Sequence, residues 1–572
     1  MWNTSVPLLL SLLACLGFGL PARAATLYVD PGHPQATDAM SCAPANPCLT
    51  ITAAAGLAQA GDTVLIAPGV YREALDLPRD GLPPDQPITF AAREAGTVHI
   101  RGSDVVDGWR RHSDAVWRKD AWPVNSQQVF VDGRPLRQTG RTCPFHDVEN
   151  MGKPFLSHTG KGVDDLAPGS FFYDEAGQTL FIRLADDSPP GGKLVEASVR
   201  PFAIVPRERE SIHLSGLEFA HSNVSSLGIY ASMANAWGRN WRIRDCSFRQ
   251  ADFSGLAVVG EGHLIDHCRF EDNGDVGLTI LGTDEAHGWA PVPGRGPQNI
   301  TVRDSSFTGN NTRGFDPAWQ AGGIKASTSC TGLVLEGLRL ENNNGPGLWL
   351  DVFCRDVLVE RCLARNNTVG VVCEISDQAV IRNNMILDND FGVLVAASSG
   401  VAVVNNTLHN NGYGVVLHGM PRQEHPELKH NRVFNNVFSQ CADTDLVLLD
   451  NPSMNAVDNV SNHNVFLNPQ GRLRHVVTGG ESFRPVRWDL ARIREESGQE
   501  TKSKASSYIF ARVSDVADLA PRPDGPLLDA GAPDAPVGDT DYFGNPRRVD
   551  ATGQGTPLPD AGAVEFQITP GS

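Results

Sequence analysis

Two carboxylates and a lysine recur at matching places in neighbouring stretches of the chain and could act together. Asp351 and Glu374 are each the fourth residue after a glycine that opens a short apolar run, and Lys325 is the second residue after another such glycine. In a fold that stacks these runs as strands, Asp351 and Glu374 would lie one strand apart, at about 4.8 Å. Carboxylates that close share a proton or hold a cation between them.

Three kinds of chemistry are compatible with this group. A retaining glycosidase holds two carboxyl groups about 5 Å apart, one as nucleophile and one as acid/base, and either residue could be the nucleophile. Asp351 and Glu374 could instead bind calcium, which would neutralise a uronate while Lys325 removes its neighbouring proton, as in a lyase. The third possibility is a charge cluster without catalytic role, because most carboxylates are solvated surface groups.

Aromatic residues around this group favour a substrate site. Trp349 shares an outward strand face with Asp351, and the segment 282–320, which interrupts the regular spacing, enters just before Lys325. A long insertion with aromatic residues beside a charged strand face is typical of a cleft wall. The residues predicted to bind substrate are Trp349, His287, Trp289, Trp319 and His418. The alternative is that Trp289 and Trp319 only cover Trp349.

The elements that would position these residues follow from a repeat. The glycines that open the apolar runs are Gly228, Gly255, Gly277, Gly323, Gly347, Gly370, Gly392 and Gly414. Apart from the interval that holds the insertion, they are 22 to 27 residues apart, and side chains after them alternate between apolar and other types. A fixed period of this length is typical of a solenoid, and alternation is typical of strands with one buried face. Each repeat is therefore predicted to be one rung of a β-solenoid.

Asparagines recur just before these glycines, as at Asn343, Asn367 and Asn389, and would stack into ladders at the turns. With Gly61-Asp62-Thr63 and Pro68-Gly69-Val70-Tyr71, these Asn-x-x-Gly rungs make the chain resemble the pectate-lyase-like right-handed parallel β-helix superfamily over residues 25–100 and 201–465. The resemblance implies the β-helix fold. It leaves the activity open, because the superfamily contains lyases, hydrolases, epimerases and non-catalytic proteins.

We therefore predict an all-β chain with a right-handed parallel β-helix solenoid, a short N-terminal capping helix near residues 51–60 and an inserted β-rich lobe. The predicted division is a signal peptide over 1–24, the cap and first rungs over 25–105, the lobe over 106–200, the main β-helix over 201–465, and a C-terminal segment with closing strands over 466–572.

The N-terminus indicates export. An apolar run from Val6 to Leu20 precedes a small-residue cleavage pattern, Ala22-Arg23-Ala24. Lipoprotein processing at Cys15 is the alternative reading. In a secreted or periplasmic chain, Cys42 and Cys48 are expected to form a disulfide.

Two further cysteine pairs have the spacing of stacked rungs, Cys246 with Cys268 and Cys330 with Cys354. They could form disulfides or a ladder of buried thiols.

A formal net charge of −18 argues against nucleic acid as a partner, and no stretch beyond the N-terminal run is long and apolar enough to span a membrane. The function expected is cleavage of a polysaccharide or oligosaccharide, with glycoside hydrolysis favoured over lyase chemistry. The alternative is a non-catalytic carbohydrate-binding or structural β-helix. Calcium is the one cofactor considered, and the oligomeric state is left open.

Overall fold

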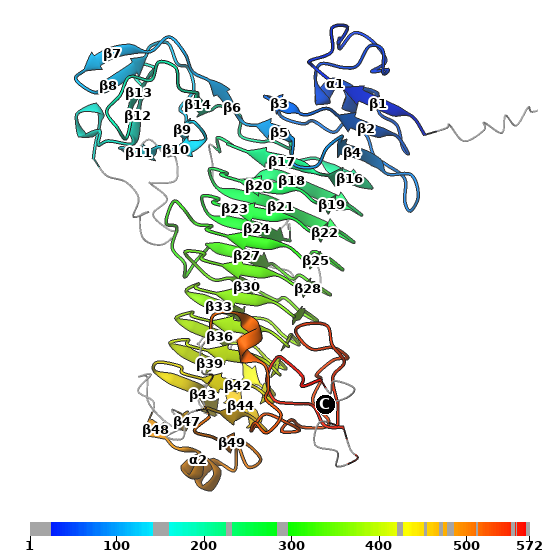
Figure 1. Cartoon of the computed structure of the whole chain (residues 1–572), viewed down its shortest axis with the longest axis vertical. Helices are drawn as coiled ribbons and strands as arrows, with labels where there is room; N and C mark the ends of the chain where they lie inside the picture. The colour runs from blue at the N-terminus through cyan, green and yellow to red at the C-terminus, as the bar shows by residue number, and fades with distance from the viewer. Residues whose placement is uncertain are drawn as a thin grey trace, which may run out of the picture.

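The structure is a computed structural model that describes residues 24–140, 160–224, 232–282, 296–419, 427–450, 455–467, 473–477, 486–508, 510, 513–550, 555 and 557–567. Three long sheets wind around one elongated core, and from β15 on most rungs of the chain add one strand to each sheet (Figure 1). The predicted all-β solenoid is confirmed.

Sheet 1 is parallel and begins each rung. Its strands are β1 (Thr26–Val29), β2 (Thr63–Ile66), β4 (Ile88–Ala92), β16 (Ile212–Ser215), β19 (Arg242–Arg244), β22 (Leu264–Asp266), β25 (Thr301–Arg303), β28 (Val334–Glu336), β31 (Leu358–Glu360), β34 (Val380–Arg382), β37 (Ala402–Val404), β41 (Arg432–Phe434) and β45 (Val460–Asn462).

Sheet 2 follows sheet 1 after a tight turn in most rungs. Its strands are β3 (Gly69–Tyr71), β5 (Val98–Arg101), β17 (Leu217–Ala220), β20 (Ser247–Arg249), β23 (Arg269–Glu271), β26 (Ser306–Thr308), β29 (Arg339–Glu341), β32 (Leu363–Arg365), β35 (Met385–Leu387), β38 (Thr407–His409), β42 (Val437–Ser439), β46 (Val465–Phe466) and β49 (Lys504–Ala505).

Sheet 3 completes each rung and carries the residues singled out in the sequence. Its strands are β15 (Glu208–Glu210), β18 (Ser232–Arg239), β21 (Ser254–Glu261), β24 (Val276–Leu281), β27 (Gly322–Ser327), β30 (Leu348–Asp351), β33 (Val369–Glu374), β36 (Phe391–Ala396), β39 (Tyr413–His418), β43 (Thr444–Asp450), β47 (Leu473–Val477) and β48 (Val486–Trp488).

Side chains of the same kind stack from rung to rung inside the solenoid. The rings of Phe248, Phe270 and Phe307 stack at centroid distances of 5.1 and 4.5 Å along sheet 2. At the turn into sheet 3, Asn343 donates to Asn367 at 3.0 Å, and Asn367 donates to Asn389 at 3.1 Å, which confirms the predicted ladder. These amides satisfy buried backbone groups as well as one another.

The repeated glycines allow neighbouring rungs to approach closely. A Cβ atom at Gly347 would lie 2.8 Å from the carbonyl oxygen of Gly370, and one at Gly370 would lie 2.6 Å from that of Gly392. Any side chain at these places would push two rungs apart. Stacking of the rungs therefore explains why glycine recurs at this interval in the sequence.

Residues 282–320 are not a single insertion, as the sequence analysis assumed. They contain β25 and β26, which are ordinary rung strands, so the extra length is divided between two loops. One loop leads from sheet 3 to sheet 1, and the other, residues 309–321, leads from sheet 2 to β27. Only the second loop is described in full.

The predicted β-rich lobe is present and projects from the N-terminal end of the solenoid (Figure 1). One of its sheets contains β6 (Ser103–Val105), β9 (Val129–Val131), β10 (Arg134–Pro135) and β14 (Val195–Ser198). The other contains β7 (Arg110–Ser113), β8 (Val116–Lys119), β11 (Arg137–Gln138), β12 (Ser170–Asp174) and β13 (Thr179–Arg183).

Two α-helices are described, one towards each end of the solenoid. Helix α1 (Ile51–Leu57) starts at Thr50, whose hydroxyl accepts from the Ala53 amide, and α2 (Leu490–Ser497) starts at Asp489. Both pack buried side chains into the main core. Neither helix is of a length and composition that could cross a membrane.

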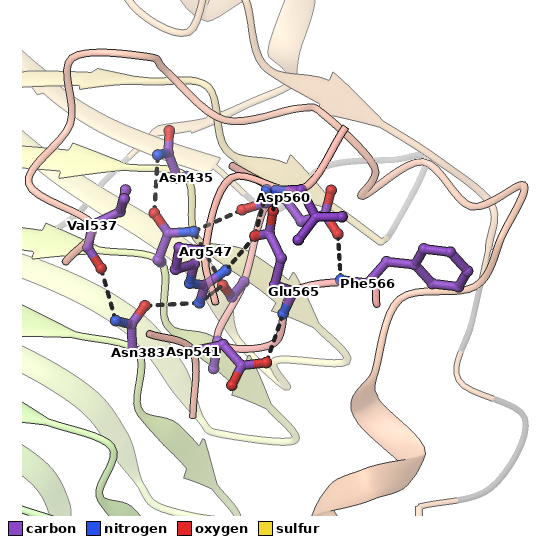
Figure 2. Close-up of polar contacts among 12 residues, drawn as sticks. Asn383, Asn435, Val537, Asp541, Arg547, Asp560, Glu565 and Phe566 are labelled. Atoms are coloured by element: carbon purple, nitrogen blue, oxygen red, sulfur yellow. Dashed lines mark hydrogen bonds and ion pairs between the residues drawn. The ribbon is translucent and has the colours of Figure 1, made fainter. Parts of the chain in front are cut away.

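The C-terminal segment, for which closing strands were predicted over residues 466–572, has strands in its first part only. Strands occur as far as β49, whereas residues 513–550 and 557–567 contain no strand and run along the outside of sheets 1 and 2. There Arg547 forms a fully buried ion pair with Glu565 and donates to the side chain of Asn383 (Figure 2). We call residues 513–567 the strap.

The cysteines resolve into one disulfide and several thiols. Cys42 and Cys48 are bonded, as predicted. Cys246, Cys268, Cys330 and Cys354 are free and buried, so the stacked pairs form thiol ladders.

Candidate functional site

The outward face of sheet 3 brings the predicted residues together. Lys325 of β27 lies beside Trp349 of β30 in the strand register, and Ser327 lies beside Asp351. Leu350 pairs with Cys373, which places the next residues, Asp351 and Glu374, side by side on adjacent rungs. The predicted stacking of the carboxylates therefore holds in the structure.

Lys325 is the centre of this group. Its Nζ atom lies 3.0 Å from Asp351 Oδ2 and 3.7 Å from the centroid of the Trp349 ring, and it donates to the Trp319 carbonyl oxygen at 2.5 Å. The side chains of Lys325 and Asp351 are only 8% and 13% exposed. This is a buried ion pair reinforced by a cation–π contact, not a cluster of solvated charges.

Glu374 completes the row of charges. Its exposure is 8%, similar to that of Asp351. The register of the next strands continues the same row through Ala396 to His418, two rungs beyond Glu374. Burial lowers the pKa of His418, so at neutral pH this imidazole is uncharged.

The loop 309–321 covers the row from one side. The Asn311 side chain binds both the amide and the carbonyl of Phe315, which fixes the loop, and Trp319 and Gln320 lie at its end. Trp319 was predicted to bind substrate through its ring. The structure shows its carbonyl bound to Lys325.

Arg313 connects this loop to two other parts of the molecule. Its guanidinium forms a buried ion pair with Asp252 of the solenoid. It also donates to Gln138 Oε1 at 3.0 Å and to the Gln127 carbonyl at 2.5 Å, both in the lobe. Burial raises the pKa of Asp252 to about 6, although Arg313 opposes this rise.

Asp275 was missed in the sequence. It lies just before β24, is fully buried, and accepts from Gln320 Nε2 at 2.8 Å through Oδ2. Burial raises its pKa to about 8, against the influence of Gln320 and the charge of Lys325. The signal was an acid two residues before Gly277, but no neighbouring rung repeats it, so alignment of the rungs could not reveal its partners.

Three buried polar atoms around Lys325 have no hydrogen-bond partner among the described residues. They are Asp275 Oδ1, Thr279 Oγ1 and Trp349 Nε1, and Thr279 lies beside Lys325 in the strand register. Each such atom costs about 1–3 kcal/mol if it stays unpaired. They lie on or beside β24 and β30, the two strands that flank the Lys325 strand β27, and this arrangement indicates a place where a polar ligand binds.

The calcium prediction fits this arrangement poorly. An ion between Asp351 and Glu374 would need carboxylate oxygens, but Oδ2 of Asp351 already contacts the Lys325 ammonium, which would repel a cation. Another acidic group, Asp266, His267 and Asp304, lies on the opposite side of the solenoid, and there Asp266 is bound by Arg303.

Two predicted residues, His287 and Trp289, lie outside the described residues. Their predicted contact with substrate stays a prediction.

Comparisons with known proteins agree with the observed architecture. A family model described as "Right handed beta helix region" matches residues 227–408 and 295–462. No curated protein matches the chain.

Among solved structures, one titled "The complex structure of XylC with xylose" is 16% identical with a TM-score of 0.57, covering 79% of this chain and 86% of that one. A second, titled "Glycoside hydrolase", is 13% identical with a TM-score of 0.47 and covers 80% and 95%. A pectate lyase, Pel9A, is 13% identical with a TM-score of 0.39 and covers 95% and 96%. With the sheet topology and the family-model match, the similarity to XylC identifies the chain as a right-handed parallel β-helix protein.

Proposed function

We propose that this chain is an exported glycoside hydrolase that cleaves a polysaccharide or oligosaccharide at the outward face of sheet 3. The observation that carries the proposal is the buried Lys325–Asp351 pair next to Glu374, together with the polar atoms of Asp275, Thr279 and Trp349 that have no hydrogen-bond partner in the described part of the chain. Burying charged and polar groups that lack some of their hydrogen-bond partners costs free energy. Such an arrangement is typical of a site that binds a ligand.

The ion pair assigns different roles to the two carboxyl groups. An ammonium in contact with Asp351 stabilises its negative charge, which suits a nucleophile. Glu374 lies one rung further, without Lys325 in contact, and we assign it the role of acid/base. Rungs about 4.8 Å apart give the separation used by retaining enzymes.

In the first step, Glu374 protonates the glycosidic oxygen while Asp351 attacks the anomeric carbon, so that the sugar–oxygen bond breaks and a glycosyl ester forms. In the second step, Glu374 takes a proton from water, which attacks the same carbon and releases Asp351. The Trp349 N–H has no hydrogen-bond partner among the described residues and would donate to a sugar hydroxyl.

Lyase chemistry is the second candidate, with Lys325 as the base. The Nζ atom of Lys325 already contacts a carboxylate, a carbonyl oxygen and an aromatic face. A base must be within reach of the substrate proton that it removes, so a Lys325 engaged on three sides favours hydrolysis.

The experiment is a panel of glycans and aryl glycosides with wild-type protein, Asp351→Asn and Glu374→Gln, with and without a chelator. Xylosides come first, because the similar XylC structure was solved with xylose. We expect new reducing ends without ultraviolet absorbance, no effect of the chelator, and a loss on the order of 10³-fold in Asp351→Asn.

Glu427→Gln, an exposed change on a distant rung, is the matched control and should keep full activity. Unsaturated products that disappear on chelation would show a metal-assisted lyase. Binding of glycans without turnover on any substrate would support the non-catalytic alternative.

A further inference from the structure

Asp275 has one satisfied and one unsatisfied oxygen. Its Oδ2 accepts from Gln320 at 2.8 Å and from the Ser254 hydroxyl at 3.4 Å. Its Oδ1 is buried without a hydrogen-bond partner in the described part of the chain. The carboxyl group is therefore held in place by one oxygen and presents the other.

At neutral pH this carboxyl group is mostly uncharged. Burial raises its pKa to about 8, and the one charged group that counteracts this rise, Lys325, is itself neutralised by Asp351. A protonated carboxyl can both donate and accept a hydrogen bond. Asp275 is therefore an uncharged group that can both donate and accept hydrogen bonds, like a side-chain amide.

Two further groups with unmet hydrogen bonds lie along the same sheet. Thr279 is on β24, four residues after Asp275, and neighbours Lys325 on the next rung, which in turn neighbours Trp349. Thr279 and Trp349 are 2% and 5% exposed, and Asp275 is fully buried. Together they present a hydroxyl, an indole N–H and a carboxyl, which is a set of donors and acceptors without net charge.

The cations near this set are already compensated. Lys325 pairs with Asp351 and Arg313 pairs with Asp252, so the described residues offer no spare positive charge for a carboxylate or sulfate. A site whose buried polar groups are made for hydroxyls discriminates strongly against ligands that lack them.

We propose that Asp275, Thr279 and the indole N–H of Trp349 form a subsite for the hydroxyl groups of a neutral sugar ring, in which Asp275 acts as an uncharged hydrogen-bonding group. The inference rests on the proposed function, since it names the class of sugar that the same site accepts. It excludes uronic acids and sulfated sugars as the residue bound here.

The test measures binding and not turnover. Calorimetry at pH 6 would compare xylose, glucose, galactose and galacturonate with wild-type protein, Asp275→Asn, Asp275→Leu and Thr279→Val, with Glu427→Gln as control. We expect a neutral sugar to bind, galacturonate to bind at least tenfold more weakly, and Leu at position 275 to reduce affinity tenfold or more. Asn, which mimics the protonated carboxyl, should stay within about threefold.

The pH dependence gives a second readout. Affinity of the wild type should fall above pH 8 as Asp275 ionises, and this fall should be missing in Asp275→Asn. If the Leu variant fails to fold, Thr279→Val still reports on the subsite and should weaken binding several-fold.

Several results would overturn the inference: preferred binding of galacturonate, no neutral sugar bound, or equal losses in the Asn and Leu variants at pH 6. Failure of the proposed function is separable from these results. Sugar binding with the expected variant pattern but without hydrolysis of the matching glycosides would remove the hydrolase assignment and leave the subsite. Hydrolysis that is insensitive to Asp275→Leu would remove the subsite and leave the hydrolase assignment.

Discussion

At the scale of single residues, Lys325 is the group on which the site's charges depend. It contacts a carboxylate, an indole ring and a backbone carbonyl at once, the first two from β30 and the third from the loop 309–321. The roles that we assign to Asp351 and Glu374 rest on this asymmetry, since only Asp351 contacts the ammonium.

Replacement of Lys325 by Met tests whether activity and stability depend on the positive charge of this residue. Asp351 would lose the positive charge that holds it in place, and kcat should fall about 10²-fold. The folded state should lose about 3–5 kcal/mol, because one member of a buried pair is left alone. Lys325→Arg keeps the charge and should retain most of the stability in denaturant unfolding.

An unchanged kcat in the Met variant would contradict the role that we assign to the Lys325–Asp351 pair. A matching loss of activity in Lys325→Arg would show instead that the shape of the side chain matters more than its charge.

The sequence predicted Lys325, Trp349 and Asp351 as a group because they recur at fixed offsets from glycines. It could not predict Asp275, because the two adjacent rungs have Phe253 and Ala321 at that place, nor the fact that Trp319 contributes a carbonyl. The backbone conformation of a loop, and hence the contacts of its carbonyls, is not encoded in a periodic pattern.

At the scale of elements, the loop 309–321 joins three parts of the protein. Arg313 holds its first half against the lobe and Asp252, while Trp319 and Gln320 hold its second half against Lys325 and Asp275. The lobe therefore supports the site without contributing a described side chain to it.

Removal of the Arg313–Asp252 ion pair should lower the free energy of unfolding, and a second change at Asp252 should restore part of it. Arg313→Met leaves the buried Asp252 without a counter-charge, and we expect a loss of about 3–5 kcal/mol in the free energy of unfolding. Adding Asp252→Asn should recover more than half of it. Recovery would be measured as a double-mutant cycle in urea, and additive losses would contradict a direct coupling.

The glycine column offers a second prediction for elements. Gly347→Ala should destabilise the protein by about 1–3 kcal/mol, because its Cβ would lie 2.8 Å from the Gly370 carbonyl oxygen. Gly56→Ala in α1 is the matched control. No atom lies within 4 Å of the added Cβ there, so this change should stabilise by about 0.5–1 kcal/mol. Thermal unfolding of both variants distinguishes a stacking requirement from a general intolerance of alanine.

Rung strands and their register could be predicted because every repeat reinforces the same pattern. The division of residues 282–320 into two loops around β25 and β26 could not, because those strands are short and lack an opening glycine. The lobe was predicted only as β-rich, since the pairing of its strands depends on contacts far apart in the sequence.

At the scale of the whole molecule, the strap ties several rungs together from outside. Asn405 donates to the carbonyl oxygens of Asp560 and Gly562, and the Gly562 amide donates to Asn435. The contacts shown in Figure 2 bury charges that are otherwise found on surfaces. Residues 513–567 carry no periodic signal, which is why the sequence did not reveal that they lie along the rungs.

The strap should make stability depend on pH. Burial, and then the charge of Glu565, raises the pKa of Asp560 to about 7 in the folded protein, against an ordinary value near 4. A raised carboxyl pKa means that the folded state holds its proton more tightly. The contribution of protonated Asp560 to the free energy of unfolding is therefore fully present below pH 4. This contribution, at most about 4 kcal/mol, is lost as the pH rises to 7.

Urea unfolding between pH 4 and pH 8 would measure this loss for the wild type and for Asp560→Asn, in which the decline over that window should be smaller. Other groups titrate in the same range, so the difference between the two proteins is the informative quantity. Identical pH profiles would show that Asp560 does not carry the effect.

The strap follows in the chain every rung that it binds, and this order bears on biosynthesis. Rungs can stack one after another in chain order, whereas residues 527–550 and 557–565 dock only onto a surface that already exists. Until they do, the outer face of sheet 2 presents Leu363, Met385 and Val437, which the strap buries in the finished fold. We expect translation products interrupted before residue 527 to display this apolar stripe to proteases, so that docking of the strap separates finished molecules from those to be degraded.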